Sequence, residues 1–542
     1  METHCIAYTD LPHTSKLFAD YLYDFPRVAD FYRHNPFGED SFEQAARSLQ
    51  YSDAQRKSVV EILAEQNKRL SAGAATEANL RRLAKPGCCA VVTGQQTGLF
   101  TGPAFSFYKA LTAIRLASTL SERGLDAVPI FWLATEDHDL AEVNHCFVQD
   151  RDGNPQRIEY SGTPPVADAP VGTVLLTEEI QSSLNALAES LPDTSARAEV
   201  MQALTDCYRP GESLSAAFGR FLAHVFRAYG VVFVDPLDER LHALSEPVFQ
   251  AAIESAGPLG EAIVARGRQL AERVYHAQVR VGDDFSLLFL CSEGRRRALR
   301  FRDGRFATAE GESFSPEELL EKLRQQPLSL SPNVLLRPVM QDFLLPTVAY
   351  VGGPAELAYF AQAAPVYERI LGRMPVVTPR ASFTLLEPPS QRLLQKYELT
   401  LQDVSSGKQL LREKMAAQFL PPDLTAAFQK AAAGLTENLD ELQTALRKLD
   451  PTLADAAENS GKKMHYQLAT LERKAAQAAQ NRTEQIERDA TRLDNSLYPQ
   501  KALQERLYSG INYLARYGPS FIDQLYAQIS AQCSNHQVVP LR

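Results

Sequence analysis

The chain has 542 residues, of which 45% are hydrophobic and 23% charged, and its net charge is −10. A domain usually takes roughly 100–200 residues, so this length allows two to four domains, and the apolar fraction excludes an intrinsically disordered chain. The acidic balance argues against a general nucleic-acid-binding protein, because such proteins usually present a strongly basic face. Small anionic substrates are not excluded, since they need only a few placed Arg or Lys side chains.

The first 30 residues are mixed and polar, without the charged segment and apolar segment that make a signal peptide. No window approaches the roughly 18 uninterrupted apolar residues of a membrane span, so we expect no membrane interaction. The seven cysteines are odd in number and scattered, which is typical of reduced cytosolic thiols, and we expect a cytoplasmic protein. Adjacent Cys88-Cys89 lacks the spacing of a zinc site, so no structural zinc is expected. The cysteines are Cys5, Cys88, Cys89, Cys146, Cys207, Cys291 and Cys533.

Short apolar runs rich in β-branched residues alternate with helical patterns along the first 387 residues. Their continuous hydrophobicity predicts strands buried on both faces, and strand–helix alternation is typical of a doubly wound α/β fold. We therefore predict a Rossmann-like parallel-sheet core. The expected strands are Cys89–Thr93, Val128–Ala134, Val231–Asp235, Thr347–Val351 and Pro375–Thr378. The expected helices are Ala104–Arg123, Leu214–Tyr229, Leu237–Ser255 and Ala355–Leu371.

Two gaps between the predicted strands are too long for ordinary strand–helix connections. We interpret them as insertions into the core, at about residues 148–212 and 257–345. The second insertion contains a hairpin pattern, Phe285–Leu290 followed by Arg300–Phe306, with Glu293-Gly294 at the turn. The predicted organisation is thus a core over 1–387, a helical arm over 388–498, and a C-terminal segment over 499–542 that returns to the core.

The predicted arm contains a long stretch without Gly or Pro between Lys462 and Tyr498. Its apolar residues recur at alternating steps of four and three, which predicts a coiled coil, with a stutter at Arg482. A break at Asp450-Pro451 favours an antiparallel helical hairpin, and we expect one flank of it to form a homodimer. The repeat positions are Leu424, Phe428, Ala431, Leu435, Leu442 and Leu449, then Met464, Leu468, Leu471, Ala475, Ala478, Ile486, Ala490, Leu493 and Leu497.

The first predicted strand leads into a glycine-rich turn, Gly94–Pro103, followed by a helix. Glycines let the backbone approach a ligand, and a helix start favours an anion, yet the spacing matches neither a dinucleotide fingerprint nor a Walker-type loop. A tight structural turn is the alternative. The candidate binding residues are Gln95, Gln96, Thr101, Tyr108 and Lys109.

The second predicted strand ends in Glu136-Asp137-His138-Asp139, followed by Glu142, Asn144 and His145. Consecutive ionisable groups at the carboxyl end of a strand favour a functional site over a surface turn. Carboxylates and imidazole suit Mg²⁺ or Mn²⁺, and His138 beside a carboxylate equally suits a general base. We assign no metal ligand.

A third polar stretch surrounds the fourth predicted strand. Arg337, Gln341 and Asp342 precede this strand, and Gly353 and Glu356 follow it at a glycine turn and helix start. Two such turns from one sheet can line a single crevice at a topological switch point. For Glu356, a helix-capping role is the alternative.

These stretches together resemble the bacillithiol biosynthesis cysteine-adding enzyme, or cysteine ligase, family. The resemblance covers nearly the whole chain in the family's order. One departure is Val274 and Ala277, which flank Tyr275-His276 where the family has Gly and Pro, so no role is given to His276. The matching segments are TGQQTGLFTGPAFSFYKALTAIRLA from Thr93, VPIFWLATEDHDLAEVNH from Val128, VVFVDP from Val231, NVLLRPVMQDFLLPTVAYVGGPAELAYFAQ from Asn333, MPVVTPRASFTLLEP from Met374 and LYPQKALQERLYSGINYLARYGPSFIDQL from Leu497.

The resemblance implies that L-cysteine is joined to the amine of glucosaminyl-malate, giving bacillithiol, by a protein that dimerises through its coiled coil. For this reaction His138, held by Asp137 or Asp139, is our candidate base. Lys109, Arg337 and Arg380 are the candidate partners of the malyl carboxylate. The glycine turns could supply N–H donors to the activated carbonyl. The remaining binding residues of the predicted site are Gln95, Gln96, Thr101, Tyr108, Asn144, His145, Gln341, Asp342, Gly353 and Glu356.

The family is also associated with nucleotide binding near the C-terminal segment, which points to Arg506, Tyr513 and Arg516. ATP or ADP would fit a ligase, but the sequence has no Walker-type motif and no H-x-G-H motif. Two other functions stay open. One is an amide ligase or nucleotidyl transferase of the same fold that acts on another amine and amino acid. The other is a coiled-coil assembly protein whose Rossmann core only binds a ligand.

Overall fold

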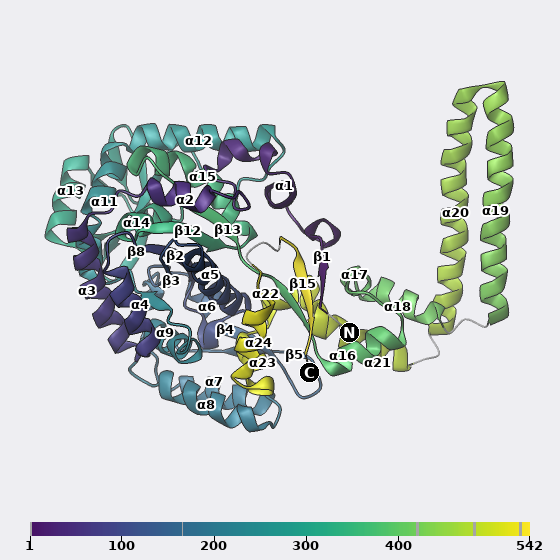
Figure 1. The fold of residues 1–542 in the computed structure, drawn as a ribbon, viewed down its shortest axis with the longest axis horizontal. Helices are drawn as coiled ribbons and strands as arrows, with labels where there is room; N and C mark the ends of the chain where they lie inside the picture. The colour runs from purple at the N-terminus through teal and green to yellow at the C-terminus, as the bar shows by residue number, and fades with distance from the viewer. Residues whose placement is uncertain (1–2, 165, 419–421, 481–483, 531–533, 542) are drawn as a thin grey trace.

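The computed structural model describes residues 3–164, 166–418, 422–480, 484–530 and 534–541. It consists of an α/β body and a pair of long antiparallel helices that project from it (Figure 1). Arg482 and Cys533, both named from the sequence, lie outside the described residues. The domain boundaries stay predictions.

Five parallel strands form the central sheet, and each coincides with a predicted strand. The order is β13-β12-β2-β3-β6, so the first of these strands in the sequence is the central one. The chain adds β3 and β6 on one side of β2, and later adds β12 and β13 on the other. The predicted doubly wound Rossmann-like fold is confirmed, with its switch point between β2 and β12. The bounds are β2 Cys89–Gln95, β3 Ala127–Leu133, β6 Val232–Val234, β12 Thr347–Gly352 and β13 Val376–Pro379.

Helices bury both faces of this sheet, as its uninterrupted apolar strands require. Within β3, Val128 and Ile130 join a core cluster that includes residues of α3, whereas Phe131 and Leu133 join residues of α5 and α9. The helices that cover the sheet or pack against those helices are α2 Ser41–Arg47, α3 Asp53–Arg69, α4 Ala74–Leu83, α5 Phe105–Glu122, α9 Leu214–Val225, α12 Ala256–Glu272, α14 Arg337–Leu344 and α15 Pro354–Ile370.

One predicted helix, Leu237–Ser255, is wrong as a single element. The structure has α10 Glu239–Leu244 and α11 Glu246–Glu254, separated at Ser245. Ser245 has a ψ of 2°, outside the helical range, and Pro247 follows two residues later. Proline lacks an N–H and crowds the residue before it, so it favours a new helix start over continuation.

The predicted hairpin is present as β7 Phe285–Ser292 and β8 Arg295–Arg302. Glu293 and Gly294 both have positive φ, as a two-residue hairpin turn needs. The predicted second strand is divided by another such turn at Asp303-Gly304, after which β9 Arg305–Ala307 begins. The antiparallel sheet has the order β10-β9-β8-β7-β11, with β10 Ser313–Phe314, α13 Pro316–Gln325 and β11 Leu330–Pro332.

The described residues between β3 and β6 form a second small hairpin and four α-helices. The hairpin pairs β4 His145–Gln149 with β5 Pro155–Glu159, after the short helix α6 Leu140–Val143. Helices α7 Ile180–Ser190 and α8 Ser195–Cys207 then precede α9.

Both chain ends meet in a three-stranded sheet of order β1-β15-β14. In it, β15 His536–Pro540 is antiparallel to β1 His4–Ile6 and parallel to β14 Phe383–Leu386. The C-terminal segment also touches the core, because the Ala104 N–H donates to the carbonyl oxygen of Tyr508 at 2.7 Å. The other terminal helices are α1 Lys16–Tyr23, α22 Gln504–Leu507, α23 Gly510–Tyr517 and α24 Ser520–Gln528.

The predicted helical hairpin consists of α19 Pro422–Leu449 and α20 Pro451–Gln480, which lie side by side (Figure 1). Asp450 accepts hydrogen bonds from the N–H and hydroxyl of Thr452, so it caps the second helix at the predicted break. The helices at the base are α16 Pro388–Lys396, α17 Leu401–Ser405, α18 Lys408–Ala417 and α21 Glu484–Leu497. Among the described residues, no helix combines the length and apolarity that a membrane span needs.

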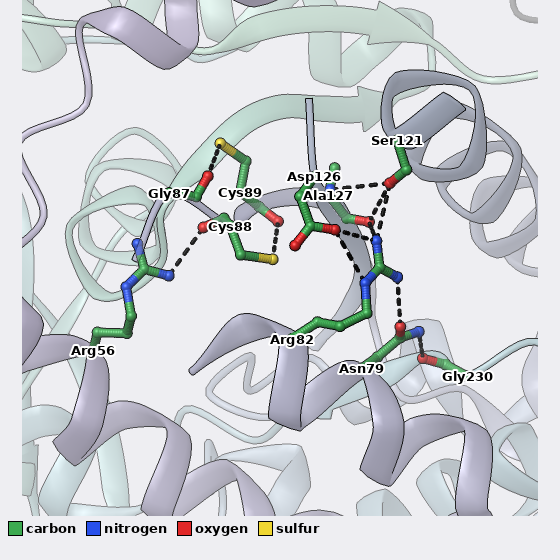
Figure 2. A network of polar contacts seen from close by, with 10 residues as sticks. All are labelled: Arg56, Asn79, Arg82, Gly87, Cys88, Cys89, Ser121, Asp126, Ala127 and Gly230. Carbon is green, nitrogen blue, oxygen red and sulfur yellow. Dashed lines mark hydrogen bonds and ion pairs between the residues drawn. The ribbon is translucent and has the colours of Figure 1, made fainter. Parts of the chain in front are cut away.

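At the amino ends of β2 and β3, polar groups bond to one another (Figure 2). Arg56 donates to the carbonyl oxygens of Leu83 and Cys88, and Arg82 pairs with Asp126 and donates to Ala127 O. Burial raises the pKa of Cys88 to about 12 and that of Cys89 to about 11, so both thiols stay protonated. We interpret this end of the sheet as structural.

Candidate active site

A cavity of about 830 Å³ lies at the opposite, carboxyl ends of the central strands. Gly94 and Gln95 of β2, Glu136–His138 after β3, and Gly353 after β12 line it, which places it at the switch point. The β7–β8 hairpin covers another side with Phe289 and Arg296, among others. This is where α/β sheets of this kind bind their ligands.

A buried ion pair joins the two central strand ends. Lys109 Nζ lies 2.6 Å from Glu356 Oε2 and donates to Gly94 O at 2.8 Å and Gln95 Oε1 at 2.9 Å. Glu356 also accepts from the Gly353 N–H and the Tyr350 hydroxyl, so it is both a cap and an ion-pair partner. Burial opposes its ionisation, but Lys109 and these donors outweigh burial and hold the Glu356 pKa below its ordinary value.

The acidic cluster after β3 divides between the cavity and the protein interior. Asp137 faces the cavity and accepts from Gln96 Nε2 at 2.6 Å and from the His138 N–H at 2.7 Å. Asp139 instead caps α6 through the Glu142 N–H. Asn144 and His145 contact each other beside the β4–β5 hairpin and do not line the cavity. The described residues contain no group of three His, Cys, Asp or Glu side chains that could hold a metal ion.

Glu136 points inward and lies 3.1 Å from Nε2 of His242, a histidine that carried no assigned role in the sequence. Both side chains are almost fully buried. Burial opposes the charge on Glu136, yet His242 and Arg296 hold its pKa below the ordinary value. Glu136 is therefore a carboxylate held at the wall of the cavity by His242 and Arg296.

Arg296 on β8 is the residue that sequence reasoning missed. Its Nη1 lies 2.9 Å from His138 Nδ1, its guanidinium stacks on Phe289 at 3.7 Å, and its Nε and Nη2 donate to Ser331 and Pro332. The only local signal is a run of three arginines, Arg295–Arg297, after the hairpin turn. Nothing in that run indicates a contact with a residue 158 positions earlier.

Cationic side chains of the cavity fall into two groups. Arg380 pairs with Glu505 at 2.6 Å, as Lys109 pairs with Glu356. Arg337, by contrast, donates to the Tyr359 hydroxyl at 2.9 Å and to Gln341 Oε1 at 3.2 Å, both neutral. Within the described residues, neither Arg337 nor Arg506 forms an ion pair with a carboxylate, and both line the cavity. Arg337 and Arg506 therefore offer guanidinium N–H donors to a ligand carboxylate.

Several predicted residues lie away from the cavity. Gln341 and Asp342 are buried behind Arg337, where Gln341 donates to Asp342 at 2.9 Å. Thr101 is buried in the glycine turn, and the Tyr108 ring packs against Phe383. Of the three predicted nucleotide contacts, Arg506 lines the cavity and the other two do not. Arg516 instead forms an ion pair with Glu387 at 3.0 Å, and the Tyr513 ring stacks on Phe521. Their roles stay predictions.

Comparison with known proteins identifies two matching family models. Residues 1–381 match the N-terminal Rossmann-like domain of bacillithiol biosynthesis BshC, and residues 383–541 match its C-terminal coiled-coil domain. A relative from Koribacter versatilis is 40% identical over 99% of both chains. Relatives from Solibacter usitatus and Salinibacter ruber are 38% and 35% identical, covering at least 96% of each chain. All three carry the name "Putative cysteine ligase BshC".

Proposed function

The chain belongs to the bacillithiol biosynthesis BshC family, and from this premise we propose that it joins L-cysteine to the amine of glucosaminyl-malate. The observation that carries the proposal is the pair of guanidiniums, Arg337 and Arg506, that face the cavity without a carboxylate partner among the described residues. A malyl group brings two carboxylates, and an arginine binds a carboxylate through two parallel N–H donors.

Arg337 is the malate contact that we favour among the three predicted cations. Lys109 and Arg380 already neutralise Glu356 and Glu505, so a ligand carboxylate would compete with a buried anion for them. Arg337 gives up only neutral partners, and a hydrogen bond to a charged group contributes about 1.5–3 kcal/mol. Lys109 and Arg380 then shape the cavity wall and hold its strand ends together.

The proposed reaction forms an amide bond. The amine lone pair attacks the cysteine carbonyl carbon, the C–N bond forms, and the carbonyl electron pair moves onto oxygen. The carboxyl oxygen can leave only once it carries a phosphate-containing group, which we propose a nucleoside triphosphate supplies. That C–O bond then breaks, and its electron pair leaves with the phosphate-bearing oxygen. The amine proton passes to a base, for which Asp137 and His138 are the cavity-facing candidates.

The coiled-coil arm supports a proposal of homodimerisation. Leu442 and Leu449 on α19 are 51% and 78% exposed, and Met464 and Leu471 on α20 are 49% and 57% exposed. Each pair is spaced by seven residues, so each forms an apolar stripe along its helix. We propose that a second copy covers these stripes. Light scattering should show a dimer that Leu442→Lys with Leu471→Lys converts to a folded monomer, and a monomeric unmodified chain would contradict this.

We also propose a cytoplasmic location, because Cys88, Cys89, Cys146, Cys207 and Cys291 are free thiols. Fractionation of cells that produce the protein tests this, and recovery outside the cytoplasm would contradict it.

The function is tested with the full chain, L-cysteine, glucosaminyl-malate, ATP and Mg²⁺, followed by mass spectrometry for bacillithiol. We expect product only when cysteine and the sugar are both present, and a large loss with Arg337→Ala. Glucosamine without malate is the matched substrate control. Equal use of both sugars would contradict the charge argument, and another preferred amine or amino acid would favour the alternative amide ligase.

A further inference from the structure

The ring nitrogen of His138 that faces Arg296 has a fixed role. A guanidinium has only N–H donors and is not deprotonated in proteins, so across the 2.9 Å contact His138 Nδ1 must be the acceptor. A neutral imidazole carries one N–H, which therefore lies on Nε2. Protonation of Nδ1 would place two donors against each other at this distance.

Arg296 is held in place independently of His138. Its guanidinium donates to Ser331 Oγ at 2.9 Å and Pro332 O at 2.8 Å, and its backbone N–H donates to Asp168 O at 3.0 Å. The side chain stacks on Phe289 and the residue is only 8% exposed. The histidine adapts to this arginine, and not the reverse.

In the part of the chain that the structure describes, no carboxylate accepts a hydrogen bond from a His138 ring nitrogen, as it would in an acid–histidine pair. In such a pair the carboxylate accepts a hydrogen bond from the Nδ1–H group. The proton is then held on Nδ1, and the unprotonated Nε2 can act as a base. Here Asp137 Oδ1 lies 3.8 Å from His138 Nδ1 and instead accepts from the backbone N–H. Glu136 bonds His242 instead, and the Phe289 ring lies 5.7 Å from the His138 ring, centroid to centroid.

We infer that His138 works as a neutral hydrogen-bond donor, through Nε2–H, to the oxygen of the activated cysteine carbonyl, and that Arg296 is the positioning residue that fixes this tautomer. The identity of the reacting groups is taken from the proposed function. As the C–N bond forms, the electron pair that moves onto oxygen is stabilised by Nε2–H, whose proton stays on nitrogen. The amine proton passes to the Asp137 carboxylate, and the phosphate-bearing group leaves with its bonding pair.

The tautomer is tested without any substrate by nitrogen-15 NMR of the full chain labelled at histidine, with His138→Gln to assign the ring. We expect a protonated Nε2 and an unprotonated Nδ1 at neutral pH, and loss of this pattern in Arg296→Met. An Nδ1–H tautomer or an imidazolium in the unmodified chain would overturn the inference. Since this measurement needs no turnover, an absence of ligase activity would refute the proposed function alone.

Two substitutions of His138 then separate a donor from a base. A glutamine amide can place an N–H near the Nε2 position, whereas an asparagine amide reaches only the Nδ1 position. We expect kcat to fall about 10-fold in His138→Gln and about 10³-fold in His138→Asn, the latter matching loss of a donor to a developing oxyanion. Equal losses in the two variants would overturn the donor role.

Arg296 is tested by a split between kcat and KM. We expect Arg296→Met to lower kcat about 10²-fold with KM within about threefold, and Arg296→Lys to recover part of it because lysine still donates. Arg295→Met, the exposed neighbour on β8, is the matched control and should leave kinetics unchanged. A loss confined to KM, or no rescue by lysine in a folded variant, would overturn the positioning role.

Discussion

At the amino ends of β2 and β3, Arg56 and Arg82 donate to protein carbonyls and to Asp126 (Figure 2). At the carboxyl ends, by contrast, Arg337 and Arg506 line a cavity. The same residue type thus has two uses in one sheet. Where arginines are bonded to protein acceptors they hold helices to strands. Where they line the cavity without a carboxylate ion pair among the described residues, as Arg337 and Arg506 do, they are available to a ligand.

The carboxyl end is itself divided, because the ion pairs Lys109–Glu356 and Arg380–Glu505 lie at the same cavity as Arg337 and Arg506, which form no ion pair among the described residues. We therefore expect the bonding partner of a residue, and not its distance from the cavity, to decide whether its substitution lowers stability or activity.

The largest effect on stability should come from Lys109→Met. Lys109 is 5% exposed, so its loss leaves the Glu356 carboxylate buried without its ion-pair partner. Removing one member of a buried pair costs about 3–5 kcal/mol, which urea unfolding would measure. The double variant with Glu356→Gln should regain part of this loss. A single variant that loses less than about 1 kcal/mol would contradict the ion-pair description.

Lowering the pH should produce the next largest loss of unfolding free energy, because His536 is protonated more readily in the unfolded chain. This buried imidazole lies between Ser382 and Thr384, and burial lowers its pKa to about 4. Because the unfolded chain binds the proton at higher pH than the folded chain, its contribution to stability is lost as pH falls from about 6.5 to 4. The loss is about 3 kcal/mol. Chemical unfolding across this range should show the slope, and His536→Asn should reduce it. An unchanged slope in the variant would exclude His536 as the cause.

Arg337→Ala should act on catalysis with little change in unfolding. Its partners are neutral, so we expect kcat/KM for glucosaminyl-malate to fall about 10²-fold, or about 2.7 kcal/mol. Steady-state assays test this, and Arg337→Lys should recover less than half of the lost free energy since lysine lacks the two-donor geometry. A drop in stability that equals the drop in activity would place Arg337 with the residues of the two ion pairs.

Arg56→Met, at the amino end of the sheet, should lower stability by a smaller amount and leave catalysis unchanged. It removes two hydrogen bonds to buried carbonyls, which we expect to cost about 2 kcal/mol of unfolding free energy. KM and kcat of the folded fraction should stay the same in parallel assays. A changed KM would show that the two ends of the sheet are coupled.

The strands of the core could be predicted because both their faces are buried, so their sequences are continuous apolar runs such as that of β3. The glycine turns could be placed because they end those runs. Arg296 and His242 could not be found, since each meets its partner across more than 100 residues. The role of Gln341 was equally hidden, because a polar residue beside a strand looks the same whether it faces a cavity or supports an arginine.

The pairing of β1 with β15 has a consequence for synthesis of the chain. His4 pairs with Val538, and the same last strand supports β14, next to the Arg380–Glu505 pair. Domains usually fold as they leave the ribosome, amino end first. Here the first strand has to wait for the last one, and Arg380 has no Glu505 until the whole arm has been made. The Arg380–Glu505 pair at the cavity wall therefore forms only after the helical arm has been synthesised.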